Sequence, residues 1–564
     1  MSLSLLNSNR LSKPEMLEIR PSNDRPIEEQ STTTAGENDH QHPPEEPPKH
    51  ADEAGPPEPE QAMVAPHTVL SEKEKIITIC IAATVSFLSP VSSDIYYPAL
   101  NLLSEELNVT RSTMNLTITA FMIVQAVAPI FIGSFSDSYG RRPAMLFCLV
   151  TCVGMNIGLA LQHSYAALLV LRCFQAFGSS TTVLLSSAVT ADLVTRAERG
   201  KYMAYSSLGL ILGPALGPLI GGILVQFLGW QSTFWFLAIW SGVMLVVVIL
   251  ILPETCRSVV GNGSIPPQRW NRSIKQVFWD KPVHDDNADA VTLAPPVKKK
   301  RATPMDSARV SCEKETACLL IFSALLFAGY SMVLSSMPSQ LGDRYDFNSL
   351  EIGLCYLPYG FGALTSRWTT GSLIDWNFRR QAAKKGVEVQ RNKQPNMNEF
   401  PVEAARLQIT IPLVYAACVG LIGYGWVMNF RTHLAGPLIM LFILAHAISG
   451  ATSTLITLIV DCHVDQPATA TAAATFFRFL LGAGAVAVAV PMTNAMGVGW
   501  MGTLIAFLLV VCSGMLWAVL IWGFEWRLQY KAKKEKKQAE RELKKKEKLG
   551  LGPLGVSQDP IEKN

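Results

Sequence analysis

The sequence contains few charged residues for its length. Only 16% of its 564 residues are Asp, Glu, Lys or Arg, whereas about a quarter is typical of soluble proteins. The charges gather in the first 75 residues, in a central block and in the last 40. Apolar runs of about 20 residues, long enough to cross a bilayer as helices, fill the sequence between them. The composition excludes an ordinary soluble enzyme and indicates a polytopic membrane protein.

Sequence motifs for catalysis and for nucleotide hydrolysis are missing. The stretch "RAERGKY" has Thr195 where a Walker motif needs its first glycine, and neither H-E-x-x-H nor G-x-S-x-G occurs. The eleven cysteines are scattered, and Cys148 and Cys152 have no further residues at metal-ligand spacing. We therefore expect a protein that is not an enzyme, with no metal, no cofactor, no disulfide framework and no nucleic-acid partner.

The ends of the chain lack the composition of folded domains. Residues 1–70 are rich in Pro, Glu, Ser and Thr and cannot bury an apolar core. No apolar run follows the first basic residues, so we expect no cleavable signal peptide. The sequence predicts a disordered cytoplasmic tail over 1–75, a cytoplasmic central loop over 254–316 and a basic cytoplasmic tail over 524–564.

Twelve apolar runs are predicted to span the membrane, six on each side of the central loop. A buried helix of a soluble core explains any one run, but not twelve in succession with short connections. We expect an all-α polytopic membrane protein with one six-helix bundle over 76–253 and another over 317–523. The spans are expected near 76–100, 114–133, 144–162, 165–187, 202–228, 232–252, 317–337, 350–372, 407–428, 435–459, 467–490 and 499–523.

The basic residues of the short loops indicate the orientation in the membrane. Loops on one side are rich in Lys and Arg, whereas those on the other carry Arg111, Arg344 and Arg431. Basic loops remain in the cytoplasm, so both termini are expected there. Asn108 begins the sequon "NVT" in the first outer loop and is a predicted glycosylation site.

One short pattern occurs twice at a constant offset. "GSFSDSYGRR" occupies 133–142 and "GSLIDWNFRR" occupies 371–380, an offset of 371 − 133 = 238 positions. Two cytoplasmic loops alike by chance would explain the arginines but not the shared glycine and acid, so we infer a parallel duplication of six spans. An acid and arginines at helix ends can hold two bundles together on the cytoplasmic side. The predicted conformational latch comprises Gly133, Asp137, Gly140, Arg141, Arg142, Gly371, Asp375, Arg379 and Arg380.

The fifth apolar run has glycine at every fourth position. Such spacing lines one helix face, where helix backbones approach closely, and proline allows the helix to bend. Ordinary packing explains this face, and so does a surface that slides or seals during transport. The residues of this helix are Gly209, Gly213, Pro214, Gly217, Pro218, Gly221 and Gly222.

Several of these stretches resemble motifs of the major facilitator superfamily. "GSFSDSYGRRP" is similar to its loop signature, although Ser138 replaces a basic residue and Phe378 replaces the second glycine in the repeat. "LRCFQAFGSS" at 171–180 is similar to the fourth-span pattern, with Ala176 for a glycine, and "GLILGPALGPLIGG" at 209–222 resembles the fifth-span antiporter pattern. "SSDIYYPAL" at 92–100 and "PET" at 253–255 resemble fungal members of the twelve-span drug:proton antiporters, which export drugs, organic acids or secondary metabolites.

The resemblance implies a proton-coupled exporter of small organic molecules in the plasma membrane, driven by a proton gradient and working by alternating access. It places Asp94 and Arg172 near each other as proton-coupling residues, and a structural ion pair is the alternative interpretation. A proton symporter for uptake and a transport-inactive sensor remain alternatives. The expected partners are substrate, protons and lipid, and we expect a monomer.

The second half has Arg367 and Arg478 within its expected spans and no acid that we expect to be buried there. Arg478 lies near mid-membrane, the depth of transporter binding sites, and predicts anionic substrates. Hydrogen bonds to carbonyls near Gly482 and Gly484 are an equal alternative for this arginine. Phe476, Phe477, Trp368 and Tyr356 are expected as apolar walls. The predicted cavity residues are Gln175, Arg367, His446 and Arg478.

Overall fold

The computed structural model describes residues 68–195, 198, 202–203, 208–263, 265–268, 271–278, 311–384, 401–463 and 467–548. The predictions for the N-terminal tail, for most of the central loop and for the end of the C-terminal tail lie largely outside these residues.

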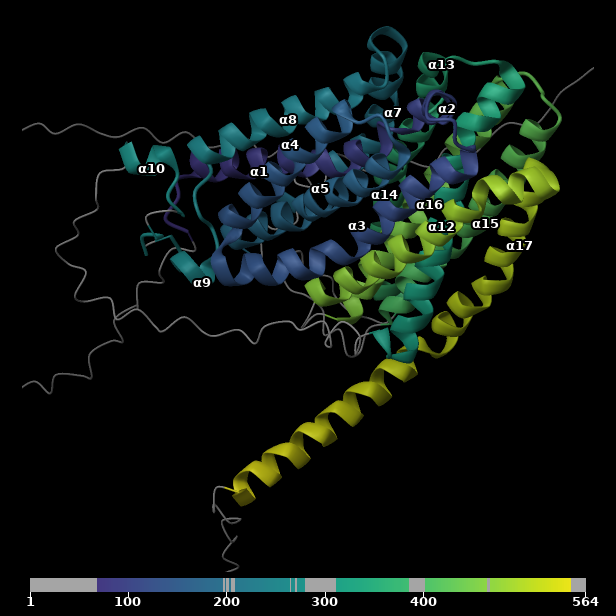
Figure 1. Cartoon of the computed structure of the whole chain (residues 1–564). Helices are drawn as coiled ribbons and strands as arrows, with labels where there is room; N and C mark the ends of the chain where they lie inside the picture. Colours follow the sequence, from purple (N-terminus) through teal and green to yellow (C-terminus); the bar gives the residue numbers. More distant parts are fainter. Residues whose placement is uncertain are drawn as a thin grey trace, which may run out of the picture. The chain divides into compact units, whose positions relative to one another are not determined.

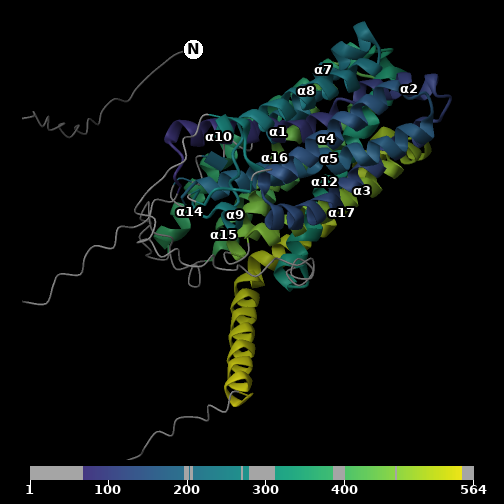
Figure 2. The ribbon, with the colours of Figure 1, turned by 60° about the vertical axis from the view of Figure 1, so that its left-hand side comes forward.

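The first half of the chain folds into long helices that pack side by side (Figures 1 and 2). Short helices extend the first of them, namely η1 (Tyr97–Ala99) and α2 (Leu100–Glu106), and others follow the last, namely α9 (Arg257–Val260) and α10 (Ile274–Phe278). The long helices are α1 (Glu72–Asp94), α3 (Arg111–Tyr139), α4 (Arg141–Leu161), α5 (Tyr165–Leu193), α7 (Leu208–Leu228) and α8 (Gln231–Leu250).

The second half repeats this arrangement. Its helices are α12 (Lys314–Tyr345), α13 (Ser349–Leu354), α14 (Leu357–Lys384), α15 (Val402–Asn429), α16 (Ala435–Cys462) and α17 (Pro467–Lys548). The last of these consists of two helices joined at Gly497, whose φ of 79° interrupts the helix. It continues through the basic segment to Lys548 (yellow in Figure 1).

The structure accounts for the twelve predicted spans. Nine helices of the described residues are long and apolar enough to cross a membrane, and α7 adds a shorter apolar segment, Leu212–Leu228. The helix α14 does not stand out by composition, because Arg367 and several Gly, Ser and Thr residues lower its mean hydropathy. The helix α17 supplies two spans, one on either side of Gly497. The nine helices, together with α7, α14 and the second part of α17, therefore account for twelve spans.

Polar and apolar side chains are distributed as a bilayer requires. Large apolar residues such as Phe227, Val419 and Phe507 are well exposed on helix surfaces, whereas Ser179 and Thr181 of α5 are fully buried. In water such exposed apolar faces would favour aggregation, but lipid solvates them, while helices satisfy the backbone hydrogen bonds internally.

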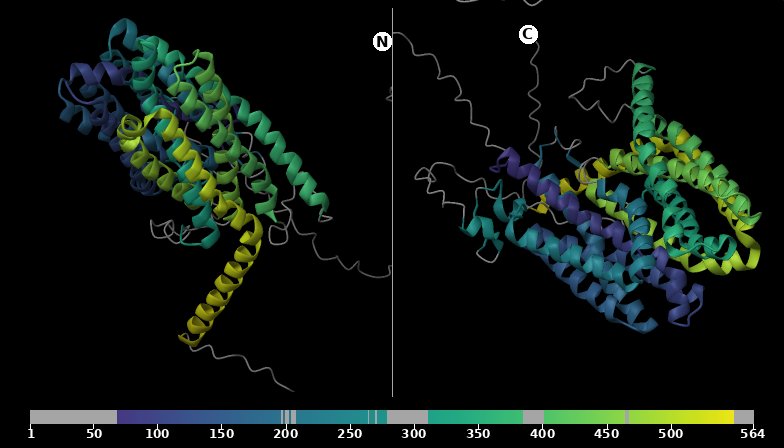
Figure 3. Two further views of the ribbon diagram at one scale, coloured as in Figure 1. Left: turned by 90° about the vertical axis from the view of Figure 1, so that its right-hand side faces the viewer. Right: turned by 90° about the horizontal axis from the view of Figure 1, so that it is seen from above.

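The two halves contact each other mainly through α3 with α17 and through α7 with α13 and α14. Figure 3 shows the first half (purple to blue) beside the second half (green to yellow). Several side-chain contacts between the halves lie near the start of α3 and the end of α12, the side predicted to be extracellular. Arg111 forms an ion pair with Asp343, Asn101 Nδ2 donates to the Pro338 carbonyl at 2.8 Å, and Tyr97 stacks on Tyr356 at 5.7 Å.

Candidate functional site

The first copy of the repeated pattern forms a cluster of charges between α3, α4 and α5. Arg141 Nη1 donates to Asp137 Oδ1 at 2.6 Å and to Ser136 Oγ at 3.0 Å, and its Nε donates to Asp192 Oδ2 at 3.0 Å. Asp137 is half exposed, whereas Arg141 and Asp192 are largely buried. These partners all belong to the first half, so in this arrangement the cluster joins three helices of one bundle.

Glu254 completes this cluster from a distant part of the chain. Its carboxylate accepts the backbone N–H of Arg141 at 2.8 Å and of Arg142 at 3.2 Å. It also accepts the Asn271 side-chain amide at 2.9 Å and the backbone N–H of Thr255 and Cys256. A carboxylate at a helix N-terminus satisfies the unpaired N–H groups and interacts favourably with the helix dipole. Glu254 therefore caps α4 and connects the segment after α8 to the turn between α3 and α4.

Gly140 allows this contact. Its φ of 115° is one that residues with a side chain rarely adopt, and a Cβ at this position would collide with the Glu254 carboxylate. The glycine ends α3 and lets the chain turn directly into α4.

The second copy does not form a loop of this kind. Gly371, Asp375, Arg379 and Arg380 lie on α14, which continues as helix to Lys384, and all four are exposed. Phe378 stands at the position that corresponds to Gly140, and a bulky residue there favours continuation of the helix. The sequence predicted a loop after residue 372, and for this copy that prediction is wrong. The ion pair that resembles Arg141–Asp192 in the second half is Arg406–Asp461, at 3.1 Å.

Arg172 is fully buried inside the first half. Its Nη1 donates to the Ser92 carbonyl at 3.0 Å and to Gln175 Oε1 at 2.7 Å, and Gln175 in turn donates to Asn156. The guanidinium lies between the rings of Tyr96 and Phe121, 4.3 and 4.4 Å from their centres. Aromatic faces stabilise a buried cation in this way. Its Nε and Nη2 have no hydrogen-bond partner.

Asp94 lies at the end of α1, close to α7, and is buried. The salt bridges of the described residues do not include one between Asp94 and Arg172. The structural ion pair that the sequence left open is therefore not formed in this arrangement, and the coupling role of both residues stays a prediction.

The glycine face of α7 packs against α1, as its spacing predicts. A Cβ at Gly209, Gly213 or Gly221 would collide with the backbone or proline ring of α1, and one at Gly217 would lie 3.3 Å from Asp94 Cβ. The adjoining edge of α7 contacts the second half instead: a Cβ at Gly222 would lie 2.6 Å from the Ser349 carbonyl oxygen of α13. Pro214 and Pro218 lie inside α7. One helix thus packs behind Asp94 and forms part of the contact between the halves.

In the second half, Arg478 of α17 lies against aromatic rings. Its guanidinium is 4.7 Å from the centre of Phe327, which packs edge-on to Phe479 and beside Tyr330. The Arg478 Nε is buried without a hydrogen-bond partner. The described hydrogen bonds include none from Arg478 to carbonyls near Gly482 or Gly484.

The other predicted cavity residues of the second half are tethered by hydroxyl groups. Arg367 Nη1 donates to Ser453 Oγ at 3.0 Å, and His446 contacts Thr365 and Thr369 through its two ring nitrogens at 3.1 and 3.2 Å. The acids of α12, α15 and α16 lie near helix ends: Glu315, Asp343, Glu403 and Asp461.

The predicted apolar walls need correction. Tyr356 is fully buried and its hydroxyl donates to the Leu334 carbonyl at 2.8 Å, while Trp368 is 75% exposed. The aromatic side chains around Arg478 are instead Phe327, Tyr330 and Tyr359, with Tyr330 and Tyr359 stacked at 5.1 Å.

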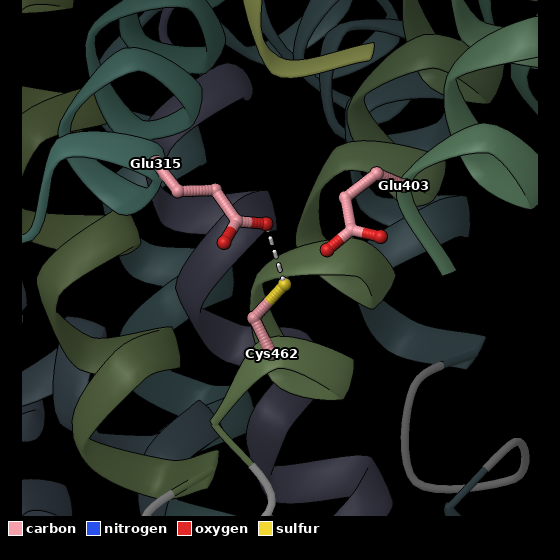
Figure 4. Close-up of side chains that lie close together, drawn as sticks. All are labelled: Glu315, Glu403 and Cys462. Carbon is pink, nitrogen blue, oxygen red and sulfur yellow. Dashed lines mark hydrogen bonds between the residues drawn. The ribbon is translucent and has the colours of Figure 1, made fainter. Parts of the chain in front are cut away.

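A further buried cluster joins the helix ends of the second half near the predicted cytoplasmic side. Figure 4 shows Glu315 and Cys462 pointing toward each other with Glu403 facing them, and their ligand atoms lie within 4.8 Å of one another. Cys462 Sγ donates to Glu315 at 3.0 Å, and Arg527 forms a two-pronged ion pair with Glu403 at 3.0 and 3.2 Å. Arg527 neutralises Glu403 in a buried salt bridge that joins α15 and α17, and the hydrogen bond between Cys462 and Glu315 joins α12 and α16 beside it.

His463 borders this cluster. Burial disfavours its charged form, but hydrogen bonds with the Glu313 carboxylate at 3.1 Å and with the Ile459 carbonyl outweigh that effect, so the pKa of His463 lies above its ordinary value. Sequence reasoning missed this cluster because its residues lie at helix ends that are distant in sequence.

The sequence model of the Major Facilitator Superfamily matches residues 82–487. The chain belongs to this superfamily. It is 41% identical over 464 residues to "MFS-type transporter R5" of a Phoma species, with 82% of this chain and 87% of that protein covered. It is 34% identical to "Citrate exporter 1" of Aspergillus niger, with 82% and 88% covered. Members of the superfamily are transporters, and this chain is a multi-pass membrane transporter and not an enzyme.

Solved structures of the superfamily share the fold. The xylose transporter XylE from E. coli, described as a partially occluded inward open conformation, matches with a TM-score of 0.56 and 13% identity, covering 79% of this chain and 97% of XylE. The human organic anion transporter MFSD10 matches with a TM-score of 0.50 and 17% identity, covering 79% and 100%. At these identities the likeness supports the two-bundle fold alone.

Proposed function

We propose that this transporter exports small organic anions across the plasma membrane in exchange for protons, by alternating access between its two bundles. The observation that carries the proposal is Arg478, a cation inside the second half whose Nε has no partner. Arginine cannot lose its charge at physiological pH and presents five donors, so it needs an acceptor. In the described part of the chain, the acids of α12, α15 and α16 lie at helix ends and do not pair with Arg478. A substrate that carries a carboxylate supplies the acceptor instead.

The aromatic residues beside Arg478 suit such a ligand. Phe327, Tyr330 and Tyr359 offer apolar faces next to one fixed cation, the combination of few polar anchors and many apolar walls found in small-molecule sites. Arg367 and His446 add donors from α14 and α16. The name of the relative "Citrate exporter 1" agrees with an anionic substrate and with export.

Proton coupling is assigned to Asp94, with Arg172 setting its proton affinity. Asp94 is buried beside α7, the helix that contacts the second half, so a change at the contact between the halves changes its surroundings. A carboxylate that alternates between a dry pocket and a wetter or more cationic one can load and release a proton.

The remaining parts of the proposal concern the orientation in the membrane, the oligomeric state and glycosylation. Both termini lie in the cytoplasm, in agreement with the basic loops, and the protein works as a monomer. Asn108 is exposed in the loop before α3 and is a candidate for glycosylation on the outer side.

The deciding test is a transport panel of matched acids, amides and amines with the wild type and Arg478→Gln. We expect the acids to be exported best and Arg478→Gln to lose most of that preference, because the substrate carboxylate loses its cation. If amines are exported best and the variant behaves like the wild type, the anion preference is wrong and a pump for cationic drugs is the better interpretation.

A further inference from the structure

A polar cavity of about 580 Å³ lies between the halves on the side predicted to be extracellular. Its walls come from the start of α3, the end of α12, the end of α15 and the part of α17 before Gly497. The lining includes three arginines and a single acid, a formal charge of 3 − 1 = +2: Arg111, Arg344, Arg431 and Asp343.

The arginines have donors available for a ligand. Arg344 uses Nη1 for the carbonyls of Met428 and Asn429, at 2.6 and 3.0 Å, and no hydrogen bond of the described residues engages its Nε or Nη2. Arg431 is exposed, with a backbone φ of 49°, and no acid of the described residues pairs with it. Arg111 is bound to Asp343, and both side chains remain partly exposed.

A neutral group in the same cavity points to a hydroxyl on the ligand. Gln340 is only 4% exposed; its Nε2 donates to Ser336 Oγ at 2.9 Å, and its Oε1 is buried with no partner. A buried carbonyl without a donor is costly. Gln340 lines the cavity, so a turn of its side-chain amide would bring Oε1 to a hydroxyl group of a ligand there.

We propose that this cavity is a second binding site, for small anions that carry two or more carboxylates and a hydroxyl group. The carboxylates pair with Arg344 and Arg431, whose planar guanidinium groups match carboxylate geometry. The hydroxyl donates to Gln340 Oε1. The N-terminus of α3, whose Thr113 N–H is capped by Thr110 Oγ1, adds the positive potential of the helix dipole at the cavity wall.

This site is separate from the one around Arg478. Val490, which lines the cavity, follows Arg478 by twelve residues on α17, which corresponds to about 18 Å along a helix. An anion in the cavity also competes with Asp343 for Arg111, and this ion pair joins the two halves. Occupation therefore weakens the outer contact and favours opening on that side. That the ligand of this cavity is also the exported substrate rests on the proposed function. That the cavity binds such an anion does not.

The test is equilibrium binding of radiolabelled citrate to the full-length protein in lipid nanodiscs. We expect Arg431→Gln to weaken binding about tenfold, as the loss of one charge-assisted contact does. Lys314→Gln, which removes the same charge from the opposite end of α12, is the control and should bind as the wild type does. Arg478→Gln should lose only the binding at the site around Arg478 and keep the component that Arg431→Gln weakens.

Tricarballylate, which has the carboxylates of citrate without its hydroxyl, tests the contact with Gln340. Tricarballylate should bind the wild type several-fold more weakly than citrate does. In Gln340→Leu the two ligands should bind equally well. The proposal is overturned if the wild type does not bind citrate, or if Arg431→Gln and Arg344→Gln both bind as tightly as Lys314→Gln. It is also overturned if Arg478→Gln abolishes all binding, a result that would leave the proposed function intact. Loss of binding in Arg431→Gln together with a failed transport panel would leave the cavity site standing without the proposed function.

Discussion

At the scale of single residues, Glu254 organises the cytoplasmic end of the first half. Its carboxylate accepts the backbone N–H groups of Arg141 and Arg142 as well as the Asn271 amide, and Gly140 gives it room. The "PET" stretch indicated only a family resemblance, since its acid lies over a hundred positions beyond the loop it caps. Asp192 was likewise missed, because only the packing of α5 against α4 brings it to Arg141.

Replacement of Gly140 by alanine tests this arrangement. The new Cβ would meet the Glu254 carboxylate on a backbone with a φ of 115°, so we expect a loss of roughly 1–3 kcal/mol in the free energy of unfolding. Gly154→Ala on α4, where nothing lies within 4 Å of the added carbon, is the matched control. Thermal unfolding in detergent should show a lower Tm for Gly140→Ala alone; equal Tm values would refute the role given to Glu254.

At the scale of helices, the comparison of α3 with α14 shows what a repeated pattern can and cannot predict. The offset of 238 correctly predicted that the chain is built of two related halves. It did not predict that α14 would continue to Lys384, because the glycine that ends α3 is replaced by Phe378. Gly371 also has open space around it, whereas a side chain at Gly133 would contact Leu184.

The spacing of glycines in α7 predicted a close helix contact but not its partners. The face of Gly209, Gly213 and Gly221 meets α1, whereas Gly222 meets α13 of the other half. Periodicity identifies a face, and only the three-dimensional packing decides what covers it. For the same reason Tyr356 and Trp368 were wrong as cavity walls, since aromatic residues do not reveal from sequence which way they face.

Gly222→Ala should loosen the outer contact between the halves. The added Cβ would lie 2.6 Å from the Ser349 carbonyl oxygen and 3.1 Å from Gly353 Cα, so α7 and α13 must move apart. A cysteine that replaces Thr493 in the outer cavity should then react several-fold faster with an impermeant maleimide. Gly242→Ala on α8, with open space around it, is the control, and equal labelling rates in the two variants would contradict the prediction.

At the scale of the whole molecule, the structure shows the halves in contact on the side predicted to be extracellular. The ion pair Arg111–Asp343, the stacked rings of Tyr97 and Tyr356 and the contact of α7 with α13 must all separate when the cavity opens outward. The partners of Arg141 lie within the first half here. A latch between the bundles on the cytoplasmic side is thus a prediction about the opposite, outward-open state.

Asp137→Asn tests this latch. Arg141 keeps Asp192 and Ser136 as partners, so we expect little change in Tm, but a shift toward the inward-open state and slower export. Labelling of cysteines placed in the cytoplasmic part of the cavity should increase, whereas Glu105→Gln, an exposed acid at the other end, should change nothing. Unchanged transport and unchanged labelling in Asp137→Asn would rule out the latch.

The central claim is that export of an organic anion is driven by protons that move the other way through Asp94. The most direct measurement uses the purified protein in sealed proteoliposomes with an imposed pH gradient, recording anion transport together with internal pH from a trapped dye. We predict that anion and proton move in opposite directions, and that Asp94→Asn abolishes gradient-driven transport while substrate exchange persists. Movement in the same direction, or gradient-driven transport that survives in Asp94→Asn, would contradict the account.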